Sequence, residues 1–346
     1  MRKGKLHSSM NTKARVAIVG ATGYGGAELV RLLANHPSAE VVTVTSERLA
    51  GTRLRRDCPW LASDLVLEAF DPEKLDVDFV FLAQEAGFAM KHAPALLKKA
   101  KVIDLSADFR LEDKEVYREY YKREWESPGL EDQPIYGLPE LVDRDSIRKA
   151  RLIANPGCYA TAAALSITPL VKAGLIQGVP VIDAKSGVSG AGRSRKETDY
   201  LFSEMTSNFK AYAITGHRHT PEIEQTAGMT IRFTPHLIPA ARGIYSTTHV
   251  QVSQGTTQEA IIDALTQAYA GSVFVNVVDQ TPSIKQVEGT NRVDISVDFD
   301  ARVGFAVISS VLDNLVKGAA GQAIQNMNLM AGLPEETGLP LNGVWP

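Results

Sequence analysis

The sequence predicts an α/β protein whose first domain is a doubly wound parallel sheet and whose second domain is an α+β domain. In the first half of the chain, short apolar runs typical of buried strands alternate with helical segments. A glycine-rich turn joins the first strand to the first helix. In the second half, longer strands of partly alternating polarity follow one another with one long helix between them. These three observations indicate two domains of different architecture.

The composition is that of an ordinary globular protein, because 44% of the 346 residues are hydrophobic and 22% are charged. The net charge is −3 and the basic clusters are short, which argues against nucleic-acid binding and favours a small-molecule substrate. Two cysteines are too few for a disulfide framework or a structural zinc site, so we expect a reducing, cytoplasmic location. Residues 152–171 carry no charge but are interrupted by Asn155, Pro156 and Gly157, which predicts a strand, a turn and a helix rather than a membrane span.

The first βαβ unit predicts a nucleotide site. An apolar strand (residues 15–19) leads into a glycine-rich turn (residues 20–26), an amphipathic helix (residues 27–34) and a second strand (residues 41–45). The glycines allow a tight turn, let the backbone approach a pyrophosphate and permit close helix packing, while the helix N-terminus supplies a positive dipole end. Their spacing is GxxGxxG, and a glycine turn without a ligand is the alternative. The position between strand and helix favours a ligand.

The end of the second strand should select the cofactor. In this fold, the residues that follow the second strand contact either the ribose hydroxyl or the 2′-phosphate. Ser46 and Arg48 suit a phosphate and therefore favour NADP. Glu47 could serve NAD instead, and we expect its side chain to point away.

Further βα units place polar residues at the carboxyl edge of the predicted sheet. Strands at residues 78–82 and 101–105 flank a helix at residues 86–100, and residues 106–110 follow the later strand. Ligands bind at this edge, so Ser106 and Arg110 should lie beside the nucleotide or substrate. Arg110 could bind a carboxylate or phosphate with two hydrogen bonds. A surface arginine paired with Asp108 or Glu112 is the alternative.

Cys158 is placed at a predicted helix start. Pro156 and Gly157 end the preceding strand, and residues 160–165 form helix readily. The first N–H groups of the helix then point at the sulfur and favour the thiolate, which is the nucleophilic form. The alternative is a small buried cysteine that only packs. We interpret Cys58, which has no helix-start context, as such a packing residue.

The second domain supplies a candidate anion loop. A strand at residues 179–185 opens into a loop of small residues, 186–193, whose backbone N–H groups could wrap a ligand. Lys185 and Arg193 at its ends favour an anion, and a flexible linker is the alternative.

A His-Arg-His motif supplies a candidate acid or base. His217 and His219 precede a helix for which Thr220 is the predicted N-cap and Pro221 the first residue. No third His or Cys lies at ligand spacing, so we expect no metal and favour a general acid or base. One of the two histidines should simply cap or pack. Glu222 could orient His219.

The remaining pattern predicts the domain boundaries. Strands near residues 242–253, 292–299 and 302–312 and a helix near 257–270 describe an α+β domain with a plausible dimer surface. A helix at residues 319–330 should pack back on the first domain. We therefore predict a disordered tail at 1–14, a nucleotide domain at 15–156, a catalytic and oligomerisation domain at 157–312, and a returning helix within 313–346.

Several segments together resemble one enzyme family. The chain resembles the N-acetyl-γ-glutamyl-phosphate reductases of arginine biosynthesis, which are related to aspartate-semialdehyde dehydrogenase. The resemblance covers nearly all of residues 15–346 and rests on residues 20–26, 105–110, 155–161, 186–192, 216–219 and 313–318. It implies a Rossmann-type doubly wound sheet with an inserted α+β domain, NADP(H) as cofactor, and a homodimer or homotetramer.

The expected cofactor contacts combine the resemblance with the motifs above. The resemblance places NADPH at residues 22–25 and 46–48 and places Asn314 near the nicotinamide. Glu47 departs from the more basic pair common in the family and leaves NAD open. The candidate cofactor residues are Gly20, Thr22, Gly23, Tyr24, Gly25, Ser46, Glu47, Arg48, Ser106, Ser189, Gly190 and Asn314.

The hypothesis that follows is reduction of an acyl phosphate through a thioester. Cys158 would attack the γ-carbonyl, phosphate would leave, and hydride from NADPH would release the aldehyde. His219, in preference to His217, would handle the proton. Arg110, Lys185 and Arg193 are candidates for the substrate anions, with Arg110 preferred, and Glu222 completes the candidate substrate site.

Three alternatives remain open at this point. One is a similar reductase of carrier-bound aminoadipyl phosphate in lysine synthesis. The second is an NADP-sensing Rossmann protein without chemistry. The third is a metal-dependent hydrolase built on His217 and His219.

Overall fold

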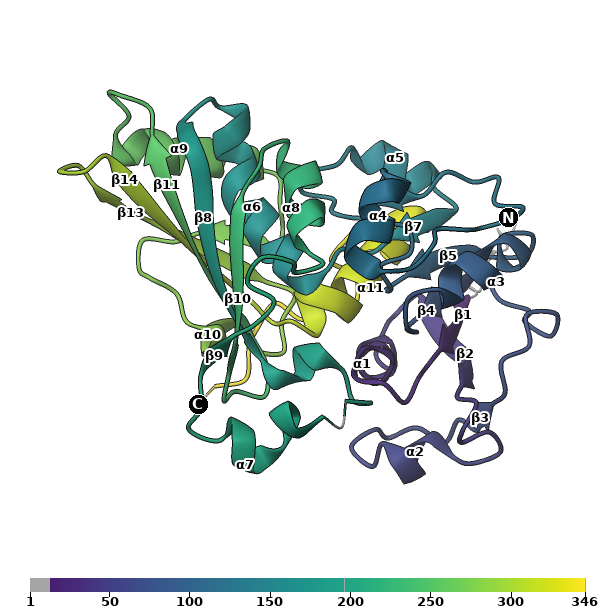
Figure 1. Ribbon diagram of the computed structural model, residues 1–346. Coiled ribbons are helices and arrows are strands. Elements are labelled where there is room, and N and C mark those ends of the chain that lie inside the picture. Colours follow the sequence, from purple (N-terminus) through teal and green to yellow (C-terminus); the bar gives the residue numbers. More distant parts are fainter. Residues whose placement is uncertain (1–12, 196, 346) are drawn as a thin grey trace, which may run out of the picture.

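The computed structural model describes residues 13–195 and 197–345, so the predicted tail lies almost wholly outside the described residues. Two seven-stranded sheets lie side by side, the first formed by the N-terminal part of the chain and the second by the later part (Figure 1). No helix among the described residues is long and apolar enough to cross a membrane.

The first sheet is parallel throughout and has the order β3-β2-β1-β4-β5-β7-β6. Neighbouring residues of β1 face two different cores: Val16 and Ile18 pack in one apolar cluster and Ala17 and Val19 in another. The sheet is therefore covered on both faces, as its near-continuous apolar strands predict. Its strands are β1 (Ala14–Val19), β2 (Ala39–Thr45), β3 (Leu67–Glu68), β4 (Phe79–Leu82), β5 (Lys101–Asp104), β6 (Ile135–Tyr136) and β7 (Leu152–Ala154).

The second sheet is mixed and has the order β12-β13-β14-β11-β8-β10-β9. Its strands are β8 (Ile176–Gly187), β9 (Lys210–Ala211), β10 (Arg232–Ile238), β11 (Ile244–Val252), β12 (Val275–Val277), β13 (Val293–Asp300) and β14 (Phe305–Leu312). Helices α6 (Cys158–Lys172), α8 (Thr220–Ala227) and α9 (Gln258–Tyr269) share one core with the sheet (Figure 1). On β11, Ile244 and Val250 face this core, while Tyr245, Thr247 and His249 on the opposite face are partly exposed.

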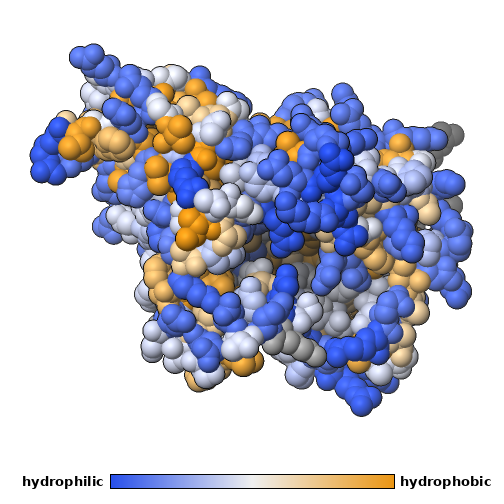
Figure 2. Space-filling view, in the orientation of Figure 1, coloured by the Kyte–Doolittle hydropathy of each residue, from blue (hydrophilic) through white to orange (hydrophobic). Residues whose placement is uncertain are grey.

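Helix α6 connects the two domains. It begins four residues after β7 ends, at the carboxyl edge of the first sheet, and then packs on the second sheet. Cys158 therefore lies where the two domains meet. Figure 2 shows the surface hollowed between the two domains.

The C-terminal segment returns to the first domain. After β14, a π-helical turn, η3 (Val316–Ala320), leads into α11 (Gly321–Met330), which packs against the first sheet and its helices (Figure 1). In the π-turn, the N–H of Gly318 donates to the carbonyl of Asp313 at 2.9 Å. The sequence pattern predicted the helix but not the widened turn.

Several elements differ from expectation. The strands β3, β6, β9, β10 and β12 were not predicted, and neither were several short helices. The other helices are α1 (Tyr24–Leu33), α2 (Leu54–Asp57), α3 (Phe88–Leu96), α4 (Lys114–Tyr121), α5 (Arg144–Lys149), α7 (Phe202–Met205) and α10 (Ile284–Val287), with 3-10 turns η1 (Val188–Ala191) and η2 (Thr198–Tyr200).

Candidate active site

The glycine-rich turn has the geometry of a phosphate cradle. Gly20 has a φ of 92°, and a Cβ there would lie 2.4 Å from the carbonyl oxygen of Ala83. A Cβ on Gly26 would lie 2.2 Å from the carbonyl oxygen of Gly20, so the helix packs too closely for a side chain. Gly23, the N-cap of α1, has no such neighbour and makes no side-chain cap. The first N–H groups of α1 thus have no side-chain cap, which fits a pyrophosphate.

The residues after β2 also fit a phosphate-bearing cofactor. The hydroxyl of Thr22 lies 3.5 Å from that of Ser46, which joins the glycine turn to the end of β2. The carboxylate of Glu47 accepts a 2.8 Å hydrogen bond from the N–H of Phe70, so it is held at the edge of the sheet. Arg48 is exposed beside it.

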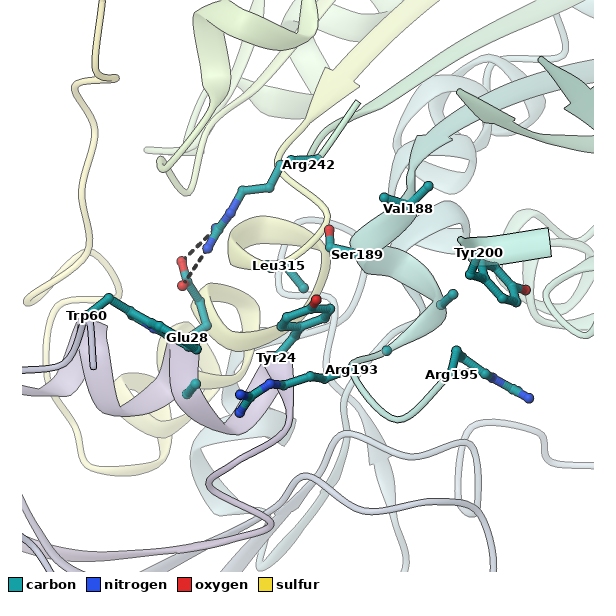
Figure 3. Close-up of a pocket in the computed structure, with 14 residues that line it drawn as sticks. Tyr24, Glu28, Trp60, Val188, Ser189, Arg193, Arg195, Tyr200, Arg242 and Leu315 are labelled. Carbon is teal, nitrogen blue, oxygen red and sulfur yellow. Dashed lines mark hydrogen bonds and ion pairs between the residues drawn. The ribbon is translucent and has the colours of Figure 1, made fainter. Parts of the chain in front are cut away.

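A cavity of about 430 Å³ lies between the start of α1 and the loop that follows β8 (Figure 3). Tyr24 and Ser189 line it from the two domains. Arg242 crosses its edge and donates to both carboxylate oxygens of Glu28, at 2.9 Å each. The cavity is therefore closed at one end by an ion pair between the domains, which sequence reasoning missed because Glu28 has the pattern of a surface helix residue.

Arg193 lies with the nucleotide turn. Its guanidinium donates to the carbonyl oxygen of Thr22 at 2.9 Å and to the carboxylate of Asp57 at 2.6 Å. It is thus a contact between the anion loop and the first domain. The neighbouring Cys58 is fully buried in the core of the first domain, which agrees with a packing role.

Three predicted cofactor residues come together beside this cavity. The side-chain amide of Asn314 donates to the hydroxyl of Ser189 at 2.9 Å and accepts from the N–H of Gly243 at 2.7 Å. Gly190 lies against them, since a Cβ there would be 3.8 Å from the Asn314 amide nitrogen. The contacts bring the end of β14 and the loop after β8 to one place.

Cys158 is the first residue of α6, as predicted, and it is partly exposed. The N-cap is Gly157, which makes no side-chain cap. Gly318 of the π-turn packs directly on Cys158, because a Cβ on Gly318 would lie 2.8 Å from Cβ of Cys158. The nucleophile candidate is thus held between the helix start and the returning C-terminal segment.

The thiol of Cys158 is not ionised by this environment. Burial raises its pKa to about 11, and the opposing effects of the Arg110 guanidinium and the N–H of Tyr159 are smaller. The expectation that the helix start alone yields a thiolate is therefore wrong. Desolvation of the charged sulfur outweighs the helix dipole, so a base must take the proton.

Glu222 binds the backbone of Gly157, the residue before Cys158. Its fully buried carboxylate accepts hydrogen bonds from the N–H of Gly157 at 2.7 Å and from the hydroxyl of Tyr136 at 2.8 Å. Among the described residues it makes no hydrogen bond to His219, contrary to the expected orienting role. The carboxylate instead accepts from Gly157 and Tyr136 and pairs with Arg110.

Arg110 is buried, and the nitrogen atoms of its guanidinium already have partners. Its Nε donates to the carbonyl of Asn155 and one Nη to that of Leu105, each at 2.8 Å, while the other Nη lies 3.5 Å from Glu222. The alternative pairing with Asp108 is wrong, since that carboxylate accepts from Gly87, Met90 and Tyr117.

His219 lies against the helix start. A Cβ on Gly157 would be 2.5 Å from Nε2 of His219 and 2.8 Å from Nη1 of Arg110. Nδ1 of His219 is buried and has no hydrogen-bond partner among the described residues. His219, not Thr220, is the N-cap of α8, because its carbonyl already accepts from the N–H of Ile223.

His217 is packed in an aromatic cage. Its ring contacts those of Tyr159, Tyr212 and Phe233 at centroid distances of 5.5, 5.5 and 5.3 Å. Its Nδ1 accepts a 3.1 Å hydrogen bond from the N–H of His219. Burial lowers the pKa of His217 to about 2 and that of His219 well below its usual value. Both rings are therefore neutral, and His217 fixes the backbone that presents His219.

The structure separates Lys185 from this cluster. Lys185 lies on β8 between Ala184 and Ser186, whose side chains face the core under α6, so its own side chain lies on the other face. There it donates to Thr247 at 2.9 Å. Ser106 lies at the end of β5, where its hydroxyl donates to the buried carboxylate of Asp104 at 2.8 Å. Within the described residues, no group of three His, Cys, Asp or Glu residues could hold a metal ion.

Comparisons with known proteins agree on one family. Residues 15–150 match the model for the NAD binding domain of semialdehyde dehydrogenase, and residues 158–314 match that for its dimerisation domain. The N-acetyl-gamma-glutamyl-phosphate reductase of Symbiobacterium thermophilum is 50% identical, with 94% of this chain and 97% of that protein covered. The enzyme of the same name from Pelotomaculum thermopropionicum is 46% identical, with 96% and 99% covered.

Solved structures show the same fold. The aspartate semialdehyde dehydrogenase II of Vibrio cholerae, complexed with ASA, has a TM-score of 0.68 at 19% identity and covers 93% of this chain and 99% of its own. The aspartate semialdehyde dehydrogenase of Candida albicans, solved with NADP, has a TM-score of 0.65 at 15% identity, with 92% and 99% covered.

Proposed function

The chain belongs to the N-acetyl-gamma-glutamyl-phosphate reductase family, and on this premise we propose that it reduces N-acetyl-γ-glutamyl phosphate to N-acetylglutamate semialdehyde in arginine biosynthesis. The observation that carries the chemistry is the meeting of Cys158 and His219 at Gly157. A thiol at a helix start and a neutral imidazole beside it are what acyl transfer to sulfur requires. Neither the carrier-linked substrate nor a sensor without chemistry is favoured by the names of the relatives.

The first step is thioester formation. As the sulfur of Cys158 bonds to the acyl carbon, its proton passes to His219 and the phosphate group leaves with the electrons of the broken C–O bond. His219 is available as the acceptor because burial keeps its ring unprotonated in the free enzyme. The N–H groups at the start of α6 would donate to the oxygen that becomes negative in the transition state.

The nucleotide cradle supports a nicotinamide cofactor, and we propose NADP(H) as the physiological form. Gly20, Gly23 and the first turn of α1 would hold the pyrophosphate, while Ser46 and Arg48 would hold the 2′-phosphate. Asn314, Ser189 and Gly190 would border the nicotinamide. When bound, the reduced cofactor supplies the hydride that converts the thioester to the aldehyde level.

The chain's residues then complete the cycle. His219 gives its proton to the oxygen that becomes negative on hydride transfer and takes it back from that hydroxyl as the C–S bond breaks. It then passes the proton to the departing sulfur, which restores the neutral thiol of Cys158. Arg110 holds the carbonyl groups of Asn155 and Leu105 and so fixes the turn before the nucleophile.

Cys158→Ser tests the covalent step. The reaction is followed in reverse, as reduction of NADP+ in the presence of N-acetylglutamate semialdehyde and phosphate. Loss of turnover with retained fold and NADPH affinity supports the proposal, and wild-type turnover in the variant refutes the thioester. The same assay with NAD+ measures cofactor preference, and we expect a higher kcat/KM with NADP+.

His219→Asn and His217→Asn separate the two histidines. If His219 is the base, its replacement lowers kcat steeply and leaves NADPH affinity intact. Replacement of His217 should act more weakly, through loosening of the aromatic cage around it. A larger loss of kcat in the His217 variant would reverse the assignment.

The matched dimerisation domain indicates an oligomer, and we propose a homodimer or homotetramer, working in the cytoplasm. The face of the second sheet that carries Tyr245, Thr247 and His249 is the proposed contact. Thr247→Arg should dissociate the oligomer and so lower the molar mass measured by sedimentation. Arg148→Ala, on the exposed side of α5, is the control and should leave the molar mass unchanged.

A further inference from the structure

The substrate named above carries two oxyanion groups, a carboxylate and a phosphate, and a cation is needed to receive them. Arg110 was the preferred residue on sequence grounds. Its Nε and one Nη donate to main-chain carbonyls, and its other Nη faces the carboxylate of Glu222 at 3.5 Å. The charge of Arg110 is therefore already balanced by a buried acid. An anion bound to Arg110 would have to lie next to that acid.

Arg218 is a second cation near His219. It stands between His217 and His219 in the chain, and it is exposed while both histidines are partly buried. Its positive charge contributes to the lowered pKa of His219, as does that of Arg110, so His219 lies within electrostatic reach of both cations. Among the described residues, no carboxylate forms an ion pair with Arg218.

The guanidinium of Arg218 is held in place without being neutralised. It lies 5.5 Å from the ring centroid of Tyr121, on α4 of the first domain. The hydroxyl of Tyr121 lies 3.5 Å from the main-chain carbonyl of Arg218 and donates to it. An aromatic face orients the planar group and leaves its N–H donors free along the edge. Two-pronged binding of a carboxylate or phosphate needs this arrangement.

We propose that Arg218 binds an oxyanion group of the substrate, beside His219 and on the open side of the Cys158 helix start. The proposal rests on the proposed function, because it identifies the residue that receives an anion of that substrate. Arg110 then keeps a positioning role, as the partner of Glu222. Arg218 could bind either the carboxylate or the phosphate, because both are oxyanions. The reverse reaction distinguishes the two, since each is then supplied by a different reactant.

In the reverse direction the two anions are separate reactants. N-acetylglutamate semialdehyde carries the carboxylate, and inorganic phosphate is added alone. For Arg218→Ala we expect the KM of one of the two to rise by about 10- to 100-fold, the range for loss of a charged hydrogen-bonded pair, with the KM of NADP+ unchanged. Arg218→Lys should recover part of the loss, because it keeps the charge but not the fork.

The control variant is Arg302→Ala, at the far end of the second sheet, where the arginine is exposed and pairs with Asp300. It should leave all KM values at wild-type levels. A rise in the KM of the semialdehyde assigns Arg218 to the carboxylate, and a rise in that of phosphate assigns it to the phosphate. If neither KM changes in Arg218→Ala, or if only kcat falls, the proposal is overturned.

A binding measurement keeps the proposal testable without turnover. Calorimetric titrations of Cys158→Ser protein with N-acetylglutamate and with inorganic phosphate are repeated in the Cys158→Ser, Arg218→Ala double variant. Loss of affinity for either anion supports the proposal, and equal affinities for both refute it. Absence of wild-type turnover with N-acetylglutamate semialdehyde would contradict the proposed function instead, so the two failures are distinguishable.

Discussion

The N–H of Gly157 donates a 2.7 Å hydrogen bond to the carboxylate of Glu222. This bond joins the residue in front of the candidate nucleophile to the helix that begins with the histidine motif. Because Glu222 is fully buried, the relative position of Cys158 and His219 is set by the protein interior and not by a surface loop. Replacement of either partner should therefore affect chemistry more than cofactor binding.

Glu222→Gln keeps the size of the side chain and an oxygen that can accept from Gly157, but it leaves the charge of Arg110 buried without its partner. We expect the free energy of unfolding to fall by about 3 kcal/mol, as for other broken buried pairs. We also expect a lower kcat. Urea unfolding and steady-state rates measure the two effects. Glu40→Gln, on an exposed residue of β2, is the control. Unchanged stability in Glu222→Gln would mean that the pair with Arg110 contributes nothing.

Gly157→Ala should displace the base. The added Cβ would lie 2.5 Å from Nε2 of His219 and 2.8 Å from Nη1 of Arg110, so the ring must move. A shift of about 1 Å can lower a rate by about 100-fold, and we expect a loss of this size in kcat with NADPH affinity retained. Gly271→Ala, where the Cβ meets open space, should behave as wild type. A fully active Gly157→Ala enzyme would argue against His219 as the base.

Alkylation of Cys158 should depend steeply on pH. Because burial raises the pKa of its thiol to about 11, the thiolate fraction in the free enzyme grows about tenfold per pH unit between roughly pH 7 and pH 9. The rate of reaction with iodoacetamide, followed by mass spectrometry of the Cys158 peptide, should rise in parallel. The fully buried Cys58 should stay unmodified and serves as the internal control. A plateau below pH 8 would indicate a thiolate already present in the free enzyme.

The folded protein should lose stability as the pH rises toward neutrality because of Asp104. Burial, with a smaller contribution from the nearby Asp108, raises the pKa of Asp104 from 3.8 to about 7. The folded state thus holds a proton that the unfolded state releases, so the unfolding free energy falls with increasing pH between these two values, by at most about 1.4 kcal/mol per pH unit. Asp104→Asn should flatten the pH dependence of Tm over this range. Asp279→Asn, on an exposed residue, is the control and should keep the wild-type pH dependence of Tm. A wild-type pH dependence in Asp104→Asn would contradict the prediction.

Features that depend on neighbours in the sequence could be predicted. The glycine turn, the strand before it and the helix start at Cys158 are local, and the structure places them as expected. The start and stop positions shift by up to four residues: the helix expected at 86–100 is α3, Phe88–Leu96, and the helix expected after Thr220 includes that residue.

Features that depend on tertiary contacts could not be predicted. Glu222 lies far along the chain from Arg110, and no spacing rule connects them. The helix dipole at Cys158 can be inferred from sequence, but the burial that outweighs it cannot. Lys185 shows the same limit: alternation along β8 is visible in the sequence, yet which face the helices cover is decided by packing.

Helix α11 has a consequence for how the protein is made. Its residues Ala323, Ile324 and Met327 belong to the same core as Val16 and Leu29, at the opposite end of the chain. Domains are generally completed in the order of synthesis, from the N-terminus. Here the part of the first domain's core that contains Val16 and Leu29 cannot close until residues 323–327 have left the ribosome, long after the rest of that domain has been made.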